Sequence, residues 1–211
     1  AIRDTADRDD VKVLVMSVKS STFSPPISPD DMRLADQMRT RSRPQWHAAF
    51  CAPTGLYQSL TYCKKTTVIA VHGSCGPVGS MWVLCSDYTV CAEHSRFESP
   101  FNCIPESNLV IAALTMRLNR AKSWMLGGEP WTADAAVNAG LVNCKRPANA
   151  VLGHAQRMAI SAARTPLDGI SSSKLLLEAF LDTQGVGQDF DMAPFYADSM
   201  HLAQPSTGVS K

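Results

Sequence analysis

The sequence lacks any long apolar run and any excess of one charge, and each absence excludes a class of protein. No stretch of its 211 residues approaches the roughly 20 consecutive apolar residues that a membrane-spanning helix needs. The 20 basic and 19 acidic residues leave a net charge of +1, without the basic excess typical of a dedicated nucleic-acid binder. The length and the 45% of hydrophobic residues instead favour one globular domain with a sizeable core.

The cysteines and histidines lack the spacing of a metal site. The seven cysteines include no Cys-x-x-Cys pair, and the five histidines are scattered along the chain. We therefore expect no bound metal, and free thiols in a reducing compartment, most simply the cytoplasm. Residues 1–7 contain no apolar segment of the kind found in secretory signal peptides, which favours the same location.

Apolar segments rich in valine alternate with helical patterns. Val11–Val18 and Thr66–Val71 are predicted to be buried strands, and the turn at 72–77 leads into a helix that ends near Ser86. The prolines of Ser24–Asp30 exclude a regular helix there. The other expected elements are a helix end within residues 1–10, a mostly helical region 31–63 interrupted at 53–55, strands at 88–91 and 96–98, helices at 107–127 and 132–139, and two helices within 148–183. This alternation predicts an α/β protein.

Three segments resemble the crotonase (enoyl-CoA hydratase/isomerase) family. Thr67–Gly73 (TVIAVHG), with Asp87 fourteen residues after Gly73, resembles the family's PVIAAVNG…CD run. Gly127–Asn143 resembles its TGxxxxAxxAxxxGLVN run, and Val11–Met32 resembles its first strand and FSAGADL loop. The resemblance implies a ClpP/crotonase spiral of ββα units. It also implies a core at 1–147 that lacks the family's N-terminal strands, and a C-terminal helical trimerisation region at 148–211.

In this family two backbone N–H groups hold the thioester oxygen of an acyl-CoA and stabilise an enolate-like charge. By resemblance these donors are the amides of Ile27 and Val78, and the residues expected around the ligand are Pro25, Pro26, Ile27, Gly76, Val78 and Gly79. Glycine normally lets the ligand approach such a turn closely, whereas Val78 restricts it. Two simpler interpretations remain open: an ordinary proline-rich loop around Ile27, and Pro77 as the first residue of a core helix.

The family's two catalytic glutamates align with Met81 and Phe101, and neither side chain can transfer a proton. Glu106 and His72 are candidate substitutes, although Glu106 is also suited to a helix start and His72 to a structural role. Glu98 is expected on the strand face opposite Phe101. Cys75 and Ser80 lack an adjacent base at a recognisable spacing, so a nucleophile is not expected here.

Three functions follow from these substitutions. The first is an acyl-CoA-binding member of the family without hydratase activity. The second is a divergent lyase or isomerase, decarboxylase or hydrolase of an acyl-CoA, as in fatty acid metabolism. The third is a structural subunit of a mixed crotonase oligomer. We expect coenzyme A only as part of the ligand, with no permanently bound cofactor, and a homo-trimer or hexamer without nucleic acid or membrane span.

Overall fold

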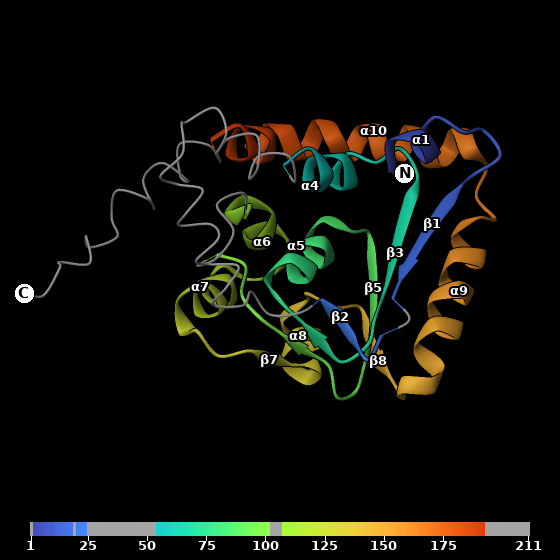
Figure 1. The fold of residues 1–211 in the computed structure, drawn as a ribbon. Helices are drawn as coiled ribbons and strands as arrows, with labels where there is room; N and C mark the ends of the chain where they lie inside the picture. The colour runs from blue at the N-terminus through green and yellow to red at the C-terminus, as the bar shows by residue number, and fades with distance from the viewer. Residues whose placement is uncertain (1, 19, 25–53, 102–106, 193–211) are drawn as a thin grey trace, which may run out of the picture.

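Two sheets form the centre of the computed structural model, which describes residues 2–18, 20–24, 54–101 and 107–192 (Figure 1). The first has the order β1-β3-β5-β8 and the second β2-β4-β6-β7, and only the β6–β7 pairing of these strands is antiparallel. The first sheet consists of β1 (Val13–Ser17), β3 (Thr66–Val71), β5 (Tyr88–Ala92) and β8 (Cys144–Arg146). The second consists of β2 (Thr22–Ser24), β4 (Ser74–Cys75), β6 (Arg96–Phe97) and β7 (Trp131–Thr132).

The chain repeatedly passes from the first sheet to the second and then enters a helix. Strands β1 and β2 precede α4 (Thr54–Thr61), β3 and β4 precede α5 (Pro77–Cys85), and β5 and β6 precede α6 (Leu109–Thr115). This order is the spiral of ββα units predicted from the sequence, and the α/β class is confirmed.

Both faces of β3 are covered, which explains why its Val68–Val71 part is continuously apolar. Val68 and Ala70 pack against α9 (Val151–Ala162) in one cluster. Ile69 and Val71 point the other way, into the larger core beneath α5. In Figure 1, α9 lies on one side of this sheet and α5 to α8 lie on the other. Strands buried on both faces lose the alternation of polar and apolar residues, and the continuous run follows.

The remaining helices agree with the predicted pattern except in one place. They are α1 (Ile2–Ala6), α7 (Leu118–Gly127), α8 (Ala133–Ala139), a short 3-10 turn (Ala148–Ala150) and α10 (Leu167–Thr183). The prediction of one helix over 107–127 is wrong, because α6 ends at Thr115 and α7 begins at Leu118. Met116 is extended (φ −132°, ψ 166°) and buried, and this break lets α6 and α7 each direct an apolar face into the core.

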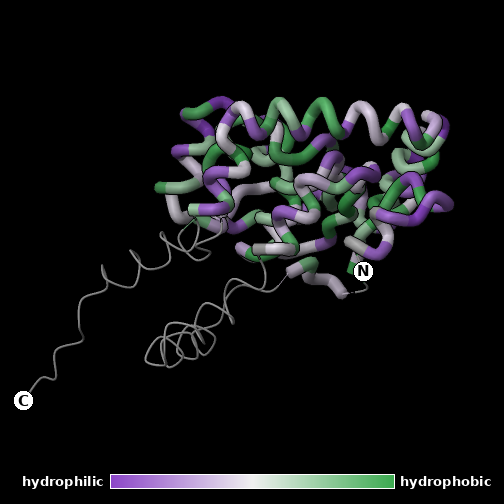
Figure 2. The backbone as a smooth tube through the Cα atoms, turned by 90° about the horizontal axis from the view of Figure 1, so that it is seen from above, coloured by the Kyte–Doolittle hydropathy of each residue, from purple (hydrophilic) through white to green (hydrophobic). Residues whose placement is uncertain are grey.

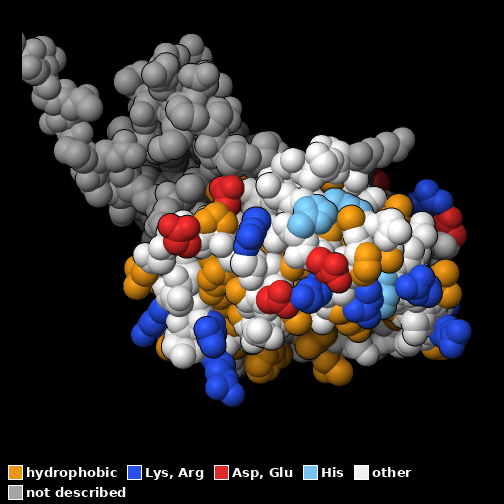
Figure 3. All heavy atoms as spheres, turned by 90° about the horizontal axis from the view of Figure 1, so that it is seen from below, with side chains coloured by type: hydrophobic (Ala, Val, Ile, Leu, Met, Phe, Trp, Pro, Cys, Tyr) orange, Lys and Arg blue, Asp and Glu red, His pale blue; other side chains and the backbone are white. Residues whose placement is uncertain are grey.

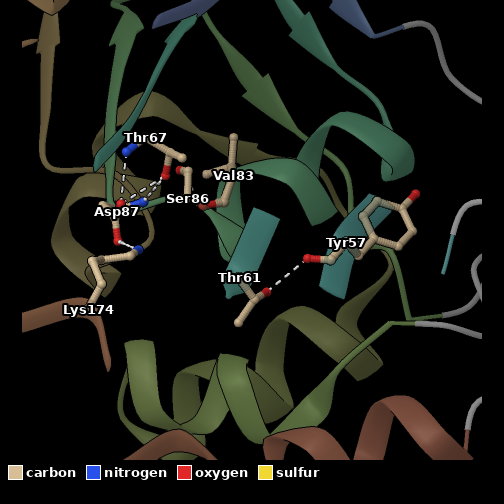
Figure 4. Close-up of polar contacts among 7 residues, drawn as sticks. All are labelled: Tyr57, Thr61, Thr67, Val83, Ser86, Asp87 and Lys174. Atoms are coloured by element: carbon tan, nitrogen blue, oxygen red, sulfur yellow. Dashed lines mark hydrogen bonds and ion pairs between the residues drawn. The ribbon is translucent and has the colours of Figure 1, made fainter. Parts of the chain in front are cut away.

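Helix α10 is joined to the body by a network around Asp87 (Figure 4). The carboxylate accepts hydrogen bonds from the Thr67 backbone N–H (2.8 Å) and hydroxyl (3.0 Å), and it pairs with the Lys174 ammonium at 2.6 Å. The two side chains of the ion pair are only 23% and 13% exposed. The network therefore links α10 to the start of β3 and to the residue before β5.

We expect Asp87→Ala to lower the free energy of unfolding by about 2 kcal/mol or more, because it leaves the Thr67 amide and a largely buried ammonium without partners. Lys174→Gln should cost about 1 kcal/mol, since the contacts with Thr67 survive. Chemical denaturation of both variants tests this order. Lys122→Gln, at an exposed position of α7, is the matched control and should be neutral; equal losses in all three variants would contradict the account.

Helix α10 carries large apolar side chains that the described residues leave exposed. Leu175, Leu176, Leu177 and Phe180 are 65%, 73%, 52% and 51% exposed. Hydrophobic and hydrophilic residues alternate along the tube of this helix in Figure 2. None of the helices in the described ranges is long and apolar enough to cross a membrane. The division of the chain at residue 147 stays a prediction.

Candidate functional site

The turn between β3 and β4 fixes the approach to α5. Gly73 has φ +63°, and a Cβ on it would overlap the backbone carbonyl oxygen of Ser21. Glycine adopts this left-handed conformation at low cost and has no side chain that could overlap the Ser21 oxygen. The Gly73 carbonyl also accepts a hydrogen bond from the Arg96 N–H, so the turn connects neighbouring units of the second sheet.

Helix α5 begins with a backbone amide, that of Val78, for which the described residues provide no acceptor. Gly76 is its N-cap, Pro77 occupies the first turn, and no side chain caps the helix. The first N–H groups of a helix have no partner within it. No acceptor for the Val78 N–H lies among the residues that the structure describes, and the Val78 side chain is 40% exposed. The positive end of the helix dipole strengthens the electrostatic attraction between this amide and an anionic oxygen.

The end of β2 lies directly against the start of α5. The Gly76 N–H donates to the Ser24 carbonyl at 2.8 Å. At Gly79 an added Cβ would come within 2.6 Å of the Ser24 Cβ and 2.9 Å of the Phe23 ring. A side chain at residue 79 would therefore push β2 and α5 apart. The segments leading to the two predicted donors thus converge at Ser24 and Gly76.

Met81, which the resemblance aligns with the family's first glutamate, is part of the core. Its side chain is 0% exposed and belongs to the main apolar cluster. Ser80 beside it is also buried, and its hydroxyl donates to the Cys75 carbonyl at 3.2 Å. Burial raises the pKa of the Cys75 thiol to about 12, so this thiol is protonated near neutral pH. Neither Ser80 nor Cys75 is placed as a nucleophile.

Phe101 is likewise part of an aromatic group in the core. It is 8% exposed and meets Trp124 edge to face, with ring centroids 6.1 Å apart. Trp124 in turn stacks on Trp131 at 5.2 Å and donates its indole N–H to the Phe97 carbonyl at 3.4 Å. Because it packs against these rings, Phe101 serves as a packing residue of the described core.

The two candidate acid/base residues that the structure describes, His72 and Glu98, occupy different places. His72 is half-buried between β3 and β4, before the Gly73 turn. Glu98 is half-buried after β6, and its N–H donates to the Cys75 carbonyl at 2.9 Å. Four residues of the predicted site, Pro25, Pro26, Ile27 and Glu106, lie outside the described residues, as does the region 31–53 expected to be mostly helical. The structure therefore brings together Gly76, Val78 and Gly79.

One residue of this region carried no sequence pattern that would single it out. Trp82 follows Met81 on α5 and meets Phe23 edge to face at 6.3 Å. Its indole N–H is buried, and it has no hydrogen-bond partner among the described residues. A tryptophan in an apolar helix is typical of a core position, and only the structure shows that its N–H has no acceptor in the described ranges. In the described ranges, no three His, Cys, Asp or Glu side chains are grouped to hold a metal ion.

A sequence model of the enoyl-CoA hydratase/isomerase family matches residues 8–191. The chain belongs to this family. The match spans the two sheets, the Gly73 turn and the start of α5. A comparison with curated protein sequences gave no match.

Solved structures of family members share the fold. An enoyl-CoA hydratase/isomerase from Mycobacterium paratuberculosis has a TM-score of 0.82 at 18% identity, covering 96% of this chain and 80% of its own. An enoyl-CoA hydratase/isomerase from Xanthobacter autotrophicus has a TM-score of 0.78 at 20% sequence identity. The match covers 96% of this chain and 74% of the other. A carnitinyl-CoA dehydratase from Mycobacterium avium has a TM-score of 0.74 at 22% sequence identity. The match covers 96% of this chain and 78% of the other. At these identities the likeness establishes the crotonase fold and leaves the reaction to the site itself.

Proposed function

We propose that the protein binds an acyl-CoA thioester and holds its carbonyl oxygen with the amides of Val78 and Ile27. The observation that carries this proposal is the open Val78 N–H at the start of α5, beside the end of β2. Gly76 adds no side chain at this corner, Gly79 lets β2 pack against α5, and Pro25 and Pro26 precede the second donor in the sequence. Coenzyme A enters as part of the ligand and is not a resident cofactor.

We expect the protein to bind the acyl-CoA thioester without hydrating it. Hydration of an enoyl-CoA requires groups that deliver and remove protons next to the bound thioester. Met81 and Phe101 have no such groups, and both pack within the core. A backbone donor stabilises the negative charge on an oxygen but cannot carry a proton to carbon. The residues described near Val78 therefore favour retention of the ligand.

We expect isothermal titration calorimetry to detect crotonyl-CoA binding, with weaker binding of an analogue in which a thioether replaces the thioester. The thioether lacks the oxygen that the two amides would hold, so the difference in affinity measures the oxyanion contribution. One hydrogen bond between uncharged groups contributes about 0.5–1.5 kcal/mol, so two predict a difference of about 1–3 kcal/mol, which is roughly five- to 150-fold in affinity.

Turnover is measured on the same samples with crotonyl-CoA and with dienoyl- and malonyl-type CoA thioesters. Binding without product formation supports the proposal. Product formation that is lost in Glu106→Gln or His72→Asn would replace it with the divergent-enzyme alternative. Equal affinity for thioester and thioether would contradict the role of the amides.

A second candidate function is that of a structural subunit in a crotonase oligomer. The apolar residues Leu175, Leu176, Leu177 and Phe180 on the outer face of α10 favour it, since contiguous exposed apolar patches mark interaction sites. The oligomer would be a homo-trimer or hexamer, or a mixed assembly with an active homologue. Failure to bind any CoA thioester, together with formation of such an assembly, would favour this candidate over ligand binding.

A further inference from the structure

Two arginines converge on one histidine at the start of α9, away from the site described above. The Nε of Arg146, on β8, lies 3.2 Å from Nδ1 of His154. Nη2 of Arg157, one turn further along α9, lies 3.2 Å from the same Nδ1. A third contact joins Nη2 of Arg146 to Nε2 of His154 at 3.4 Å. We call Arg146, His154 and Arg157 the α9 cationic cluster.

The hydrogen-bonding roles in this cluster leave one acceptor missing. Guanidinium nitrogens are always donors, so Nδ1 of His154 is the acceptor for the Arg146 Nε–H, and the Arg157 Nη2 shares the single lone pair of that nitrogen. The proton of the neutral ring then lies on Nε2. Nε2 and the Arg146 Nη2 are consequently two donors facing each other at 3.4 Å. An oxygen atom with free lone pairs, placed beside both donors, would satisfy them together.

The charge around the cluster points to the same missing group. Neither Arg146 nor Arg157 has an ion-pair partner in the described ranges, and the first turn of α9 contains no acidic residue to offset its helix dipole. Nearby Lys145 is already paired with Asp134 at 2.5 Å. Glu93 lies next to β8, because its backbone N–H donates to the Arg146 carbonyl at 3.0 Å. The Glu93 side chain forms no ion pair with the residues that the structure describes.

The cluster is accessible to a ligand. Arg157 is exposed, and Arg146 and His154 are half-buried. On the face seen in Figure 3, Lys, Arg and His side chains lie at the surface with Asp and Glu side chains among them. Of the five N–H groups of a guanidinium, Arg157 uses one in described hydrogen bonds, so its remaining donors are open.

We propose that the α9 cationic cluster is a binding site for a phosphate group, held by Arg146, Arg157 and the Nε2–H of His154. Phosphate offers several acceptor oxygens around one centre, and planar guanidinium forks match its geometry. Its dianionic charge offsets the repulsion between two arginines that a chloride or a single carboxylate would offset less well. The phosphate is either free or a monoester of a larger molecule. This proposal does not depend on acyl-CoA binding.

The protonation of His154 supplies an internal reporter of binding. Burial, and then the charges of Arg146 and Arg157, lower the pKa of His154 below its usual value. A bound phosphate places negative charge beside the ring and favours the imidazolium, so the pKa of His154 must rise when the site is occupied. A phosphate that bound elsewhere on the surface would leave this pKa unchanged.

Nuclear magnetic resonance of the histidine ring protons, during titration with inorganic phosphate and separately with glycerol 3-phosphate at constant ionic strength, tests the site. We expect the His154 signals to shift saturably and the His154 pKa to rise with at least one of the two ligands. Tighter binding of the monoester identifies a larger phosphorylated molecule as the ligand, and tighter binding of phosphate identifies the free ion. No saturable His154 shift with either ligand would overturn the proposal.

Arg157→Gln should weaken phosphate binding by about tenfold, as expected for a lost charge-assisted hydrogen bond. Arg157→Lys should recover only part of the affinity, because it keeps the charge without the fork. Arg164→Gln, after the end of α9, removes the same charge outside the cluster and is the matched control. Equal affinities for the Arg157→Gln and Arg164→Gln proteins would show that general charge attracts the ion and would overturn the site. The exposed position of Arg157 keeps both of its variants compatible with the fold.

Discussion

Met81→Glu is expected to destabilise the protein by about 3–5 kcal/mol at neutral pH instead of restoring a catalytic acid. The Met81 side chain is 0% exposed among the apolar residues of the main core. A carboxylate at residue 81 would lose its hydration, and the apolar residues described around it offer no cation in return. Chemical denaturation gives the loss directly, and Met81→Leu, which keeps the volume and polarity, should cost about 1.5 kcal/mol or less.

The penalty for Met81→Glu should depend on pH with a defined sign. Burial raises the pKa of the introduced carboxyl in the folded state above its unfolded value of about 4.3. Below that value the group is neutral in both states, and the charge penalty is absent. As the pH rises through the folded-state pKa, the penalty becomes complete. A variant as stable as Met81→Leu at neutral pH, or hydration of crotonyl-CoA by Met81→Glu/Phe101→Glu, would show that residue 81 reaches solvent and substrate.

Gly73→Ala is the second substitution expected to have a large effect. The left-handed φ of +63° costs a residue with a side chain about 1–3 kcal/mol, and the new Cβ would overlap the Ser21 carbonyl. Because the overlapping atom is backbone, relief requires β2 and the turn to separate. We expect a total loss of about 3 kcal/mol or more, together with loss of acyl-CoA binding.

Gly153→Ala is the matched control for this prediction. Gly153 lies inside α9, where an added Cβ would meet only the Arg157 Nη1 at an ordinary 3.7 Å. Alanine in a helix interior is favoured over glycine by about 0.5–1 kcal/mol, so this variant should be slightly more stable than the wild type. Thermal unfolding of the two variants should therefore move in opposite directions. A Gly73→Ala protein with wild-type stability would contradict the described turn.

The elements with a strong local pattern were predicted from the sequence, and those made by distant contacts were not. The apolar run of β3 and the proline at the start of α5 are visible locally, so both elements were expected at nearly their observed bounds. Strands β4, β7 and β8 have two or three residues each, too few to show a period. The break at Met116 lacks glycine or proline and depends on the core around it.

The candidate site was only partly accessible to sequence reasoning. Its positions came from resemblance, which aligned Val78 and Met81 but did not reveal the exposure of either. Burial of Met81 depends on residues from several elements that meet only in the folded chain. The ion pair between Asp87 and Lys174 joins residues 87 positions apart, and no local pattern connects them. For the same reason the convergence of Arg146 and His154, on different elements, was not foreseen.

The central claim, that the Val78 amide holds a thioester oxygen, is tested most directly by a cycle of two proteins and two ligands. Val78→Pro removes the N–H, whereas Val78→Ala keeps it and is the control. Proline after Pro77 also restrains the backbone, so crotonyl-CoA and its thioether analogue are compared on each protein by calorimetry.

We expect Val78→Ala to retain the preference for the thioester and Val78→Pro to lose roughly three- to tenfold of it, which is the contribution of one hydrogen bond. A general disturbance of the site would weaken both ligands equally and leave their ratio unchanged. The same preference for the thioester in Val78→Pro and Val78→Ala would contradict the assignment of this amide.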